Sequence, residues 1–325
     1  MSTHSLAAPS LEALESTCNA PAIKPQRVDS AKLSWHTAAL LVGGLAVGAA
    51  GVVLLSVCLP AGVALIAASV GLIWIATIQC LNHYAHHFPK PIEKAVHYLY
   101  ALTTEVLSLV AVSCLYPAAL YSPKAAKRKP GKTPVLLVHG YLHNGSGWVY
   151  HKRRLKAAGF DSVHTVNLGK NPFRSITDYA EVVKAKAEEI AAATGRTDLI
   201  LIGHSMGGLV SSYYATMLAP KGTVTNVVTI GSPLGGSPLA LCACGKNARE
   251  METDSPFLQE LKAEISQSST RFHHIGSEAD PIVPGHRAVA ETGHCFLIND
   301  LGHLGLLFSP RVANLLDGCL TATPV

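Results

Sequence analysis

Residues 201–208 read Leu-Ile-Gly-His-Ser-Met-Gly-Gly, and this stretch decides the fold. The apolar run 198–202 predicts a buried strand, and residues 208–218 have the composition of a helix. A serine on a sharp turn between a strand and a helix is typical of a nucleophile elbow. The residues two before and two after it must lack a Cβ, because the turn is cramped. Such a turn points Ser205 Oγ outward at a helix N-terminus, where backbone N–H groups can bind an oxyanion.

Beyond residue 133 the sequence alternates between strand and helix patterns. Strands are predicted at 134–139, 162–168, 198–202, 223–230, 271–276 and 294–298, and helices at 147–158, 176–193, 208–218 and 311–318. Strands separated by helices pair in parallel through right-handed crossovers, and ligands bind at their carboxyl ends. We therefore expect an α/β fold over residues 133–325, with a mostly parallel sheet flanked by helices.

Two later loops carry the partners that a serine nucleophile needs. A serine hydroxyl reacts when a base removes its proton, and the base needs an orienting acid. In this type of sheet the order is serine, acid, histidine, with the last two on loops after later strands. Asp280 follows the strand at 271–276, and His303 follows the strand at 294–298. We assign Ser205 as the nucleophile, Asp280 as the acid and His303 as the general base.

Neighbouring side chains are alternatives to this assignment. The alternative acids are Glu278 and Asp300, and the alternative bases are His286 and His294. Two further histidines, His273 and His274, lie within a predicted strand, where a structural role is the usual interpretation.

Backbone N–H groups at two places predict an oxyanion hole. One belongs to Met206, directly after the serine, and the other to Tyr141, in the loop after the first strand. Gly140 lets that loop turn toward the serine, and we expect His139 to pin the loop through its ring nitrogens. The supporting residues of the site are His139, Gly140, Gly203, His204 and Gly207.

Composition excludes other classes of function. Residues 1–133 contain ten Lys or Arg and five Asp or Glu, whereas residues 134–325 contain sixteen of each, so the net charge of +5 belongs to the N-terminal part. No basic stripe with interleaved aromatic residues occurs, so we expect no nucleic-acid partner. Cys242-x-Cys244 lacks a second pair at ligand spacing, and we expect no metal and no cofactor. The scattered cysteines indicate free thiols and a reducing compartment.

The N-terminal part carries the signal of a membrane protein. Residues 33–89 contain no Asp, Glu, Lys or Arg. The apolar segments 38–59 and 63–81 are each long enough to cross a bilayer core of about 30 Å. We therefore predict a flexible tail over 1–32 and a transmembrane helical hairpin within 33–94. Basic residues flank both ends of the hairpin, which favours a cytoplasmic catalytic domain held at the membrane.

A third apolar stretch, 95–121, is interrupted by His97, Glu105 and Pro117. A basic linker follows it, and the two together make up residues 95–132. It has two interpretations: a third membrane span, or an amphipathic helix that lies on the membrane surface or on the catalytic domain. The sequence leaves both open, together with the oligomeric state.

These motifs resemble the α/β-hydrolase superfamily, and within it bacterial triacylglycerol lipases and esterases and the GPI inositol-deacylase-like lipases. The resemblance is carried by residues 138–141, 203–208, 229–237, 280–284 and 302–303. It extends from about residue 134 to the C-terminus, and it implies hydrolysis of a carboxylic ester through an acyl-enzyme. Anchoring at a membrane would place the site beside lipids, which favours an acylglycerol or another acyl lipid as substrate over small soluble esters. Such folds often insert a lid at the place that corresponds to residues 238–269 of this chain. The motif Phe257-Leu258-x-x-Leu261 in this segment either covers an acyl pocket or belongs to an ordinary surface helix.

Two other functions are compatible with the same motifs. The serine can pass the acyl group to another acceptor or cleave a thioester, or the fold can be a catalytically silent interaction module. The presence of Ser205, Asp280 and His303 together argues against the silent module.

Overall fold

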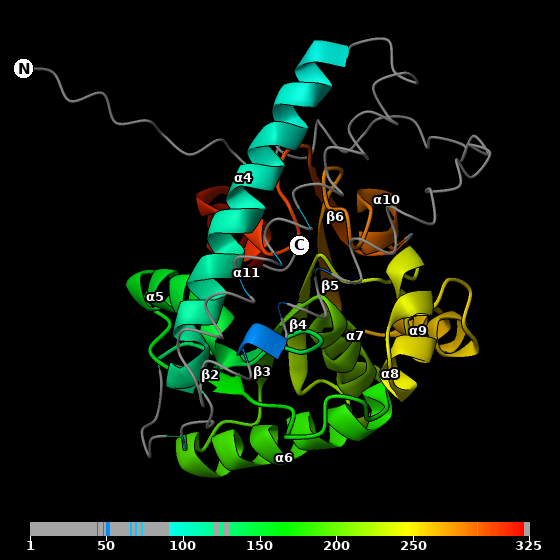
Figure 1. Ribbon diagram of the computed structural model, residues 1–325. Coiled ribbons are helices and arrows are strands. Elements are labelled where there is room, and N and C mark those ends of the chain that lie inside the picture. Colours follow the sequence, from blue (N-terminus) through cyan, green and yellow to red (C-terminus); the bar gives the residue numbers. More distant parts are fainter. Residues whose placement is uncertain are drawn as a thin grey trace, which may run out of the picture.

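The protein is built on a six-stranded sheet in which every strand pair is parallel (Figure 1). The computed structural model describes isolated positions between 44 and 73 and residues 91–119, 124–125, 131–290 and 292–321. The strands are β1 Val135–Val138, β2 Val163–Val166, β3 Leu199–His204, β4 Val224–Ile230, β5 Arg271–Ser277 and β6 His294–Ile298. All six predicted strands are confirmed, with ends that differ by at most two residues.

The strand order is β2-β1-β3-β4-β5-β6. The chain moves outward from β1 to β2, returns past β1 to β3, and then continues in the other direction. The direction of winding therefore reverses between β1 and β3, which is the place where open α/β sheets bind ligands at their carboxyl ends. Val138 at the end of β1 pairs with Gly203 near the end of β3, so the loops after these strands start side by side.

Helices cover both faces of the sheet. From residue 91 onward the helices of the described residues are α4 Pro91–Leu115, α5 Val149–Ala157, α6 Ile176–Thr194, α7 Met206–Tyr213, α8 Lys246–Glu250, α9 Pro256–Gln267, α10 Gly285–Ala288 and α11 Pro310–Thr321. Side chains alternate along each strand, so Leu136 and Val138 pack with α6, α7 and α9, whereas Val135 and Leu137 pack with α5 and α11. Both faces are apolar, as a parallel sheet covered on both sides requires.

The helix expected at 208–218 differs from the prediction. It starts two residues earlier, because Ser205 is its N-cap, and it ends as α7 at Tyr213. A π-helical turn, η3 Tyr214–Leu218, continues it. The hydroxyls of Ser211, Ser212 and Thr216 each donate to the carbonyl four residues earlier, a pattern that often accompanies bent helices.

Residues 238–269 contain two different structures. α9 belongs to the flanking layer, because Leu258, Leu261 and Ile265 are buried in the core and Phe257 stacks on Tyr213. The preceding part consists of the short helix η4 Pro238–Cys242 and of α8. The apolar motif at 257–261 thus belongs to an ordinary flanking helix, whereas α8 reaches the serine turn through Asn247, whose amide donates to Met206 Sδ at 3.2 Å.

The third apolar stretch of the sequence forms α4, a long helix that lies across the loops at the carboxyl ends of the strands (Figure 1). It contacts the short helices η2 Gly145–Trp148 and η5 Gly305–Phe308 and continues into η1 Tyr116–Ala119. Its segment His97–Leu115 is long and apolar enough to cross a membrane by length and composition, a test that core helices also pass. The observed contacts place α4 on the catalytic domain. The predicted tail lies outside the described residues, and of the predicted hairpin too few positions are described to test it.

Candidate active site

Ser205 lies on a strained turn between β3 and α7. Its backbone angles, φ 55° and ψ −131°, are unusual for a residue with a side chain. Its N–H donates to the carbonyl oxygen of Ile230 at the end of β4, at 2.9 Å. The turn is therefore held against the neighbouring strand, and Ser205 Oγ stands at the N-terminus of α7.

The glycines around the serine are required by close approach of backbone segments. A Cβ on Gly203 would overlap the carbonyl of Gly207, and a Cβ on Gly207 would overlap the carbonyl of Val138. The prediction that the turn leaves no room for side chains at these two positions is confirmed. A side chain is also excluded at Gly140, since its Cβ would lie 2.8 Å from the Cβ of Ser205.

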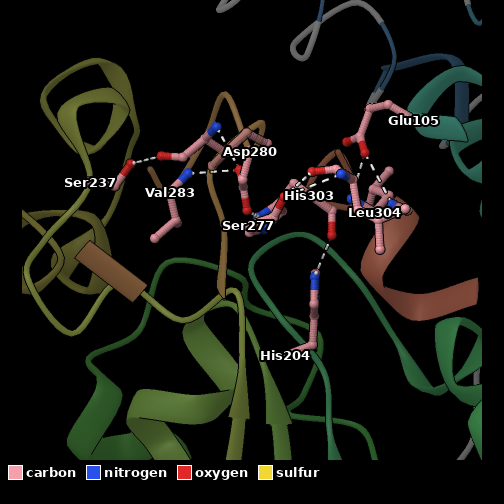
Figure 2. A network of polar contacts seen from close by, with 11 residues as sticks. Glu105, His204, Ser237, Ser277, Asp280, Val283, His303 and Leu304 are labelled. Atoms are coloured by element: carbon pink, nitrogen blue, oxygen red, sulfur yellow. Dashed lines mark hydrogen bonds and ion pairs between the residues drawn. The ribbon is translucent and has the colours of Figure 1, made fainter. Parts of the chain in front are cut away.

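His303 and Asp280 form a buried pair (Figure 2). His303 Nδ1 donates to Asp280 Oδ2 at 2.7 Å, while Asp280 Oδ1 accepts from the N–H groups of Ile282 and Val283 at 2.8 and 2.9 Å. Burial alone lowers the pKa of His303, but the carboxylate of Asp280, its hydrogen bond and the charge of Glu105 together raise this pKa above its usual value. The pair has the geometry of a base held by an orienting acid.

The serine and the pair both lie next to the end of β4. Ser205 is bonded to Ile230, and a Cβ on the next residue, Gly231, would lie 3.4 Å from both His303 Nδ1 and Asp280 Oδ2. Ser205 and the pair thus adjoin two consecutive residues, Ile230 and Gly231, although Ser205 and His303 are 98 residues apart in the sequence.

The backbone around His303 is held at several points (Figure 2). Ser277 Oγ donates to the carbonyl of Leu301 at 2.6 Å, and His204 Nε2 donates to the carbonyl of His303 at 3.0 Å. On the other side, Glu105 Oε2 accepts from the N–H groups of Leu304 and Gly305 at 2.7 and 3.1 Å. Three elements, β5, β3 and α4, thus position one short loop.

His139 holds the loop after β1. Its Nδ1 donates to the carbonyl of Gly140 at 2.9 Å, and its Nε2 accepts from the N–H of Leu168 at 3.1 Å. Burial lowers the pKa of His139 to about 3, so the ring is neutral, as this pattern of one donor and one acceptor requires. These two hydrogen bonds join the loop after β1 to the loop after β2. The loop continues to Tyr141, whose N–H is the predicted second oxyanion donor, while Met206 is the first residue of α7, where an N–H has no intrahelical acceptor.

The alternative acids and bases lie elsewhere. Glu278 and His286 are exposed, and Asp300 forms an ion pair with Arg311. His294 is exposed and stacks on His273. Asp280 is the carboxylate that bonds the imidazole of His303.

The strand histidines have structural partners. His274 Nδ1 bonds Thr229 Oγ1 at 2.8 Å, and His273 Nε2 lies 3.5 Å from the amide of Asn226. Burial lowers the pKa of both rings to about 4. Within the described residues, no group of three or more His, Cys, Asp or Glu side chains is arranged to hold a metal ion.

The segments that follow β1, β2 and β4 carry exposed apolar side chains. Tyr141 Oη donates to the carbonyl of Cys244 at 2.8 Å, and the rings of Tyr141 and Phe173 are 6.5 Å apart. Leu142, Phe173 and Leu241, from the loops after β1 and β2 and from η4, are 44%, 45% and 74% exposed. We call these three side chains the apolar rim.

Residues 135–266 match the model of the alpha/beta hydrolase family, a range that includes β1 to β4 and the whole serine turn. Over this range the chain resembles the α/β-hydrolase family, its sheet has the α/β-hydrolase fold, and the chain is similar to lipases and esterases. The matched range ends before Asp280 and His303, so their assignment depends on the geometry described above.

Two curated relatives are triacylglycerol lipases. Those of Pseudarthrobacter phenanthrenivorans and Burkholderia plantarii are each 37% identical over 114 residues, or 33% of this chain. The matches cover 35% and 31% of the relatives, so the chain spans about a third of the length of the curated relatives it matches.

Two solved structures share the fold. A Bacillus licheniformis lipase in its mature form matches with a TM-score of 0.53 and 18% identity, covering 62% of this chain and 98% of that one. Aspergillus fumigatus lipase B matches with a TM-score of 0.50 and 21% identity, covering 59% and 53%.

Two contacts of the site were missed from the sequence. Glu105 was visible as a carboxylate in an apolar helix, but nothing in the sequence indicated its partner nearly 200 residues away. His204 was named as a supporting residue, and its bond to the carbonyl of His303 gives that support a mechanism.

Proposed function

We propose that this protein is a serine carboxylic ester hydrolase of the lipase or esterase type. The observation that carries the proposal is the buried His303–Asp280 pair beside Ser205 on its strained turn. His303 Nε2 removes the proton of Ser205 Oγ, which attacks the ester carbonyl. The N–H groups of Met206 and Tyr141 bind the oxyanion. His303 then gives its proton to the leaving alcohol, and water releases the acid in a second cycle of the same steps.

The substrate class that we propose is an acyl lipid such as an acylglycerol. Two curated relatives carry the name triacylglycerol lipase. The apolar rim supplies uncharged side chains on segments that follow β1, β2 and β4, and we propose that they receive the acyl chain of a bound ester. Anchoring through the apolar segments within 33–94, with the catalytic domain on the cytoplasmic side, would place this site at a lipid surface.

The test uses the full-length protein in detergent and a fluorophosphonate probe, which labels an activated serine. We expect the probe to label the wild type and not Ser205→Ala. Ser277→Ala is not a suitable control, because Ser277 holds the His303 loop. Ser266→Ala, on the exposed side of α9, is the matched control. An unlabelled wild type, or undiminished labelling of Ser205→Ala, would disprove the serine mechanism.

A second measurement addresses the substrate. Hydrolysis of p-nitrophenyl esters of increasing acyl length should become faster toward long chains. Activity confined to short chains would favour an esterase of small substrates over a lipase.

A further inference from the structure

We propose that Glu105 of α4 is a positioning residue for His303, so that the N-terminal helix is a working part of the active site. The inference rests on the proposed function, and it adds a residue outside the sheet and outside the range matched by the family model. Glu105 does not touch the reacting atoms. It acts through the backbone that follows His303.

One oxygen of Glu105 binds two consecutive amides. Oε2 accepts from Leu304 N–H at 2.7 Å and from Gly305 N–H at 3.1 Å (Figure 2). These are the first two amides after His303, and hydrogen bonds to a charged acceptor are about twice as strong as neutral ones. His204 also donates to the carbonyl of His303. The peptide group between His303 and Leu304 is therefore bound at both its C=O and its N–H.

The His303 loop is shaped to receive α4. It reads Gly302-His303-Leu304-Gly305, and a Cβ on Gly302 would overlap the carboxylate of Glu105 and lie 2.9 Å from its Cβ. A Cβ on Gly305 would lie 3.1 Å from Thr104 Oγ1. Both glycines thus allow a close approach that a surface helix would not need.

The charge of Glu105 is coupled to the pair. Burial raises its pKa to about 7; His303 opposes this shift, Asp280 adds to it, and the two amide bonds lower the pKa. The short helices η2 and η5, which α4 contacts, contain no ionisable side chain, and Tyr116 in η1 has a pKa raised by burial from an already high value. Glu105 in turn raises the pKa of His303. Its ionised form therefore both binds the amides more strongly and favours protonated His303.

The test compares Glu105→Ala and Glu105→Gln with the wild type in the full-length protein. Glu105→Ala removes the acceptor, and we expect kcat to fall about tenfold to a hundredfold with KM nearly unchanged, because the base loses its orientation. Glu105→Gln keeps a neutral acceptor and should recover most of kcat. It also removes a negative charge near His303, so the acid limb of kcat/KM should move about half a unit to one unit to lower pH.

Two controls separate positioning from general damage. Thr103→Ala changes an exposed α4 residue whose hydroxyl bonds only its own helix, and Glu260→Ala removes an exposed carboxylate on α9. Neither should change kcat or the pH profile. Circular dichroism reports whether each variant is folded. Should Glu105→Ala fail to fold, the pH profile of Glu105→Gln decides.

Superimposable pH profiles for Glu105→Gln and the wild type, with equal kcat in a folded Glu105→Ala, would overturn this proposal alone. A wild type that fluorophosphonate does not label would instead overturn the proposed function. The two failures are therefore distinguishable.

Discussion

His204 Nε2 lies 3.0 Å from the backbone carbonyl oxygen of His303, and the two imidazole rings are 4.6 Å apart. Burial lowers the pKa of His204 well below its usual value, so its ring is neutral and donates from Nε2. The residue directly before the proposed nucleophile thus holds the residue that carries the proposed base. The serine turn and the His303 loop are therefore joined by a direct hydrogen bond.

Replacing His204 should remove this hydrogen bond. His204→Phe keeps the aromatic ring but leaves the carbonyl of His303 without its donor, which we expect to cost about 1–3 kcal/mol of unfolding free energy. Because the loop shifts, kcat should fall roughly tenfold. Urea unfolding and ester hydrolysis measure the two effects. His286→Phe, at an exposed position, is the control, and equal behaviour of both variants would contradict the coupling.

Asp280→Asn should disturb the orientation of the His303 imidazole without destabilising the fold. An asparagine oxygen can still accept from Ile282 and Val283, so we expect the melting temperature to change little. The imidazole of His303 loses its preferred tautomer, and kcat should fall roughly a thousandfold to ten-thousandfold. Glu278→Gln is the matched control for an exposed carboxyl of the same loop. A larger loss in Glu278→Gln than in Asp280→Asn would reassign the acid.

Gly207→Ala should destabilise the fold severely. Its Cβ would overlap the carbonyl of Val138 and lie 2.5 Å from that of His139, and backbone atoms cannot give way cheaply. We expect a loss of more than about 4 kcal/mol, measured by urea unfolding. A Cβ on Gly131 meets nothing within 4 Å, so Gly131→Ala should be neutral. A stable Gly207→Ala would show that the turn can widen.

His151 should make stability depend on pH. Burial, as the largest effect, lowers the pKa of His151 to about 4, against about 6.5 in the unfolded chain. Between these values the unfolded state binds a proton that the native state does not, so the unfolding free energy falls as the pH drops from about 6.5 to about 4. The full effect is at most about 3 kcal/mol.

His151→Gln tests this dependence, because glutamine keeps a donor for the carbonyl of Leu306, to which His151 Nε2 bonds at 3.1 Å, and does not titrate. Urea unfolding at about pH 7 and pH 4.5 should show a smaller difference in the variant than in the wild type. An identical difference would mean that other groups cause the acid sensitivity.

The apolar rim should affect long substrates alone. Leu241→Asp places a charge on an exposed apolar side chain, so stability should not change. We expect hydrolysis of long-chain p-nitrophenyl esters to fall several-fold, because each buried methylene of the acyl chain contributes about 0.8 kcal/mol, while short-chain esters react as before. Met217→Asp, exposed on η3, is the control. Equal loss on short and long esters would exclude a role in acyl binding.

Much of the fold was predictable from local patterns. Six apolar strand patterns and the intervening helical patterns sufficed for a parallel α/β sheet, since periodicity reports which face of an element is buried. Helix ends were less predictable. The end of α7 at Tyr213 and the π-helical turn after it depend on side-chain bonds to the backbone that composition does not reveal.

The sequence by itself determined the strand order along the chain, the glycines of the serine turn and the order of Ser205, Asp280 and His303, because these follow from local geometry and chain direction. Tertiary structure alone decided which carboxylate bonds His303, that α9 is a flanking helix, and that Glu105 reaches the loop after the base. Those contacts join residues far apart in the chain. They depend on how the elements pack in three dimensions, which local sequence does not encode.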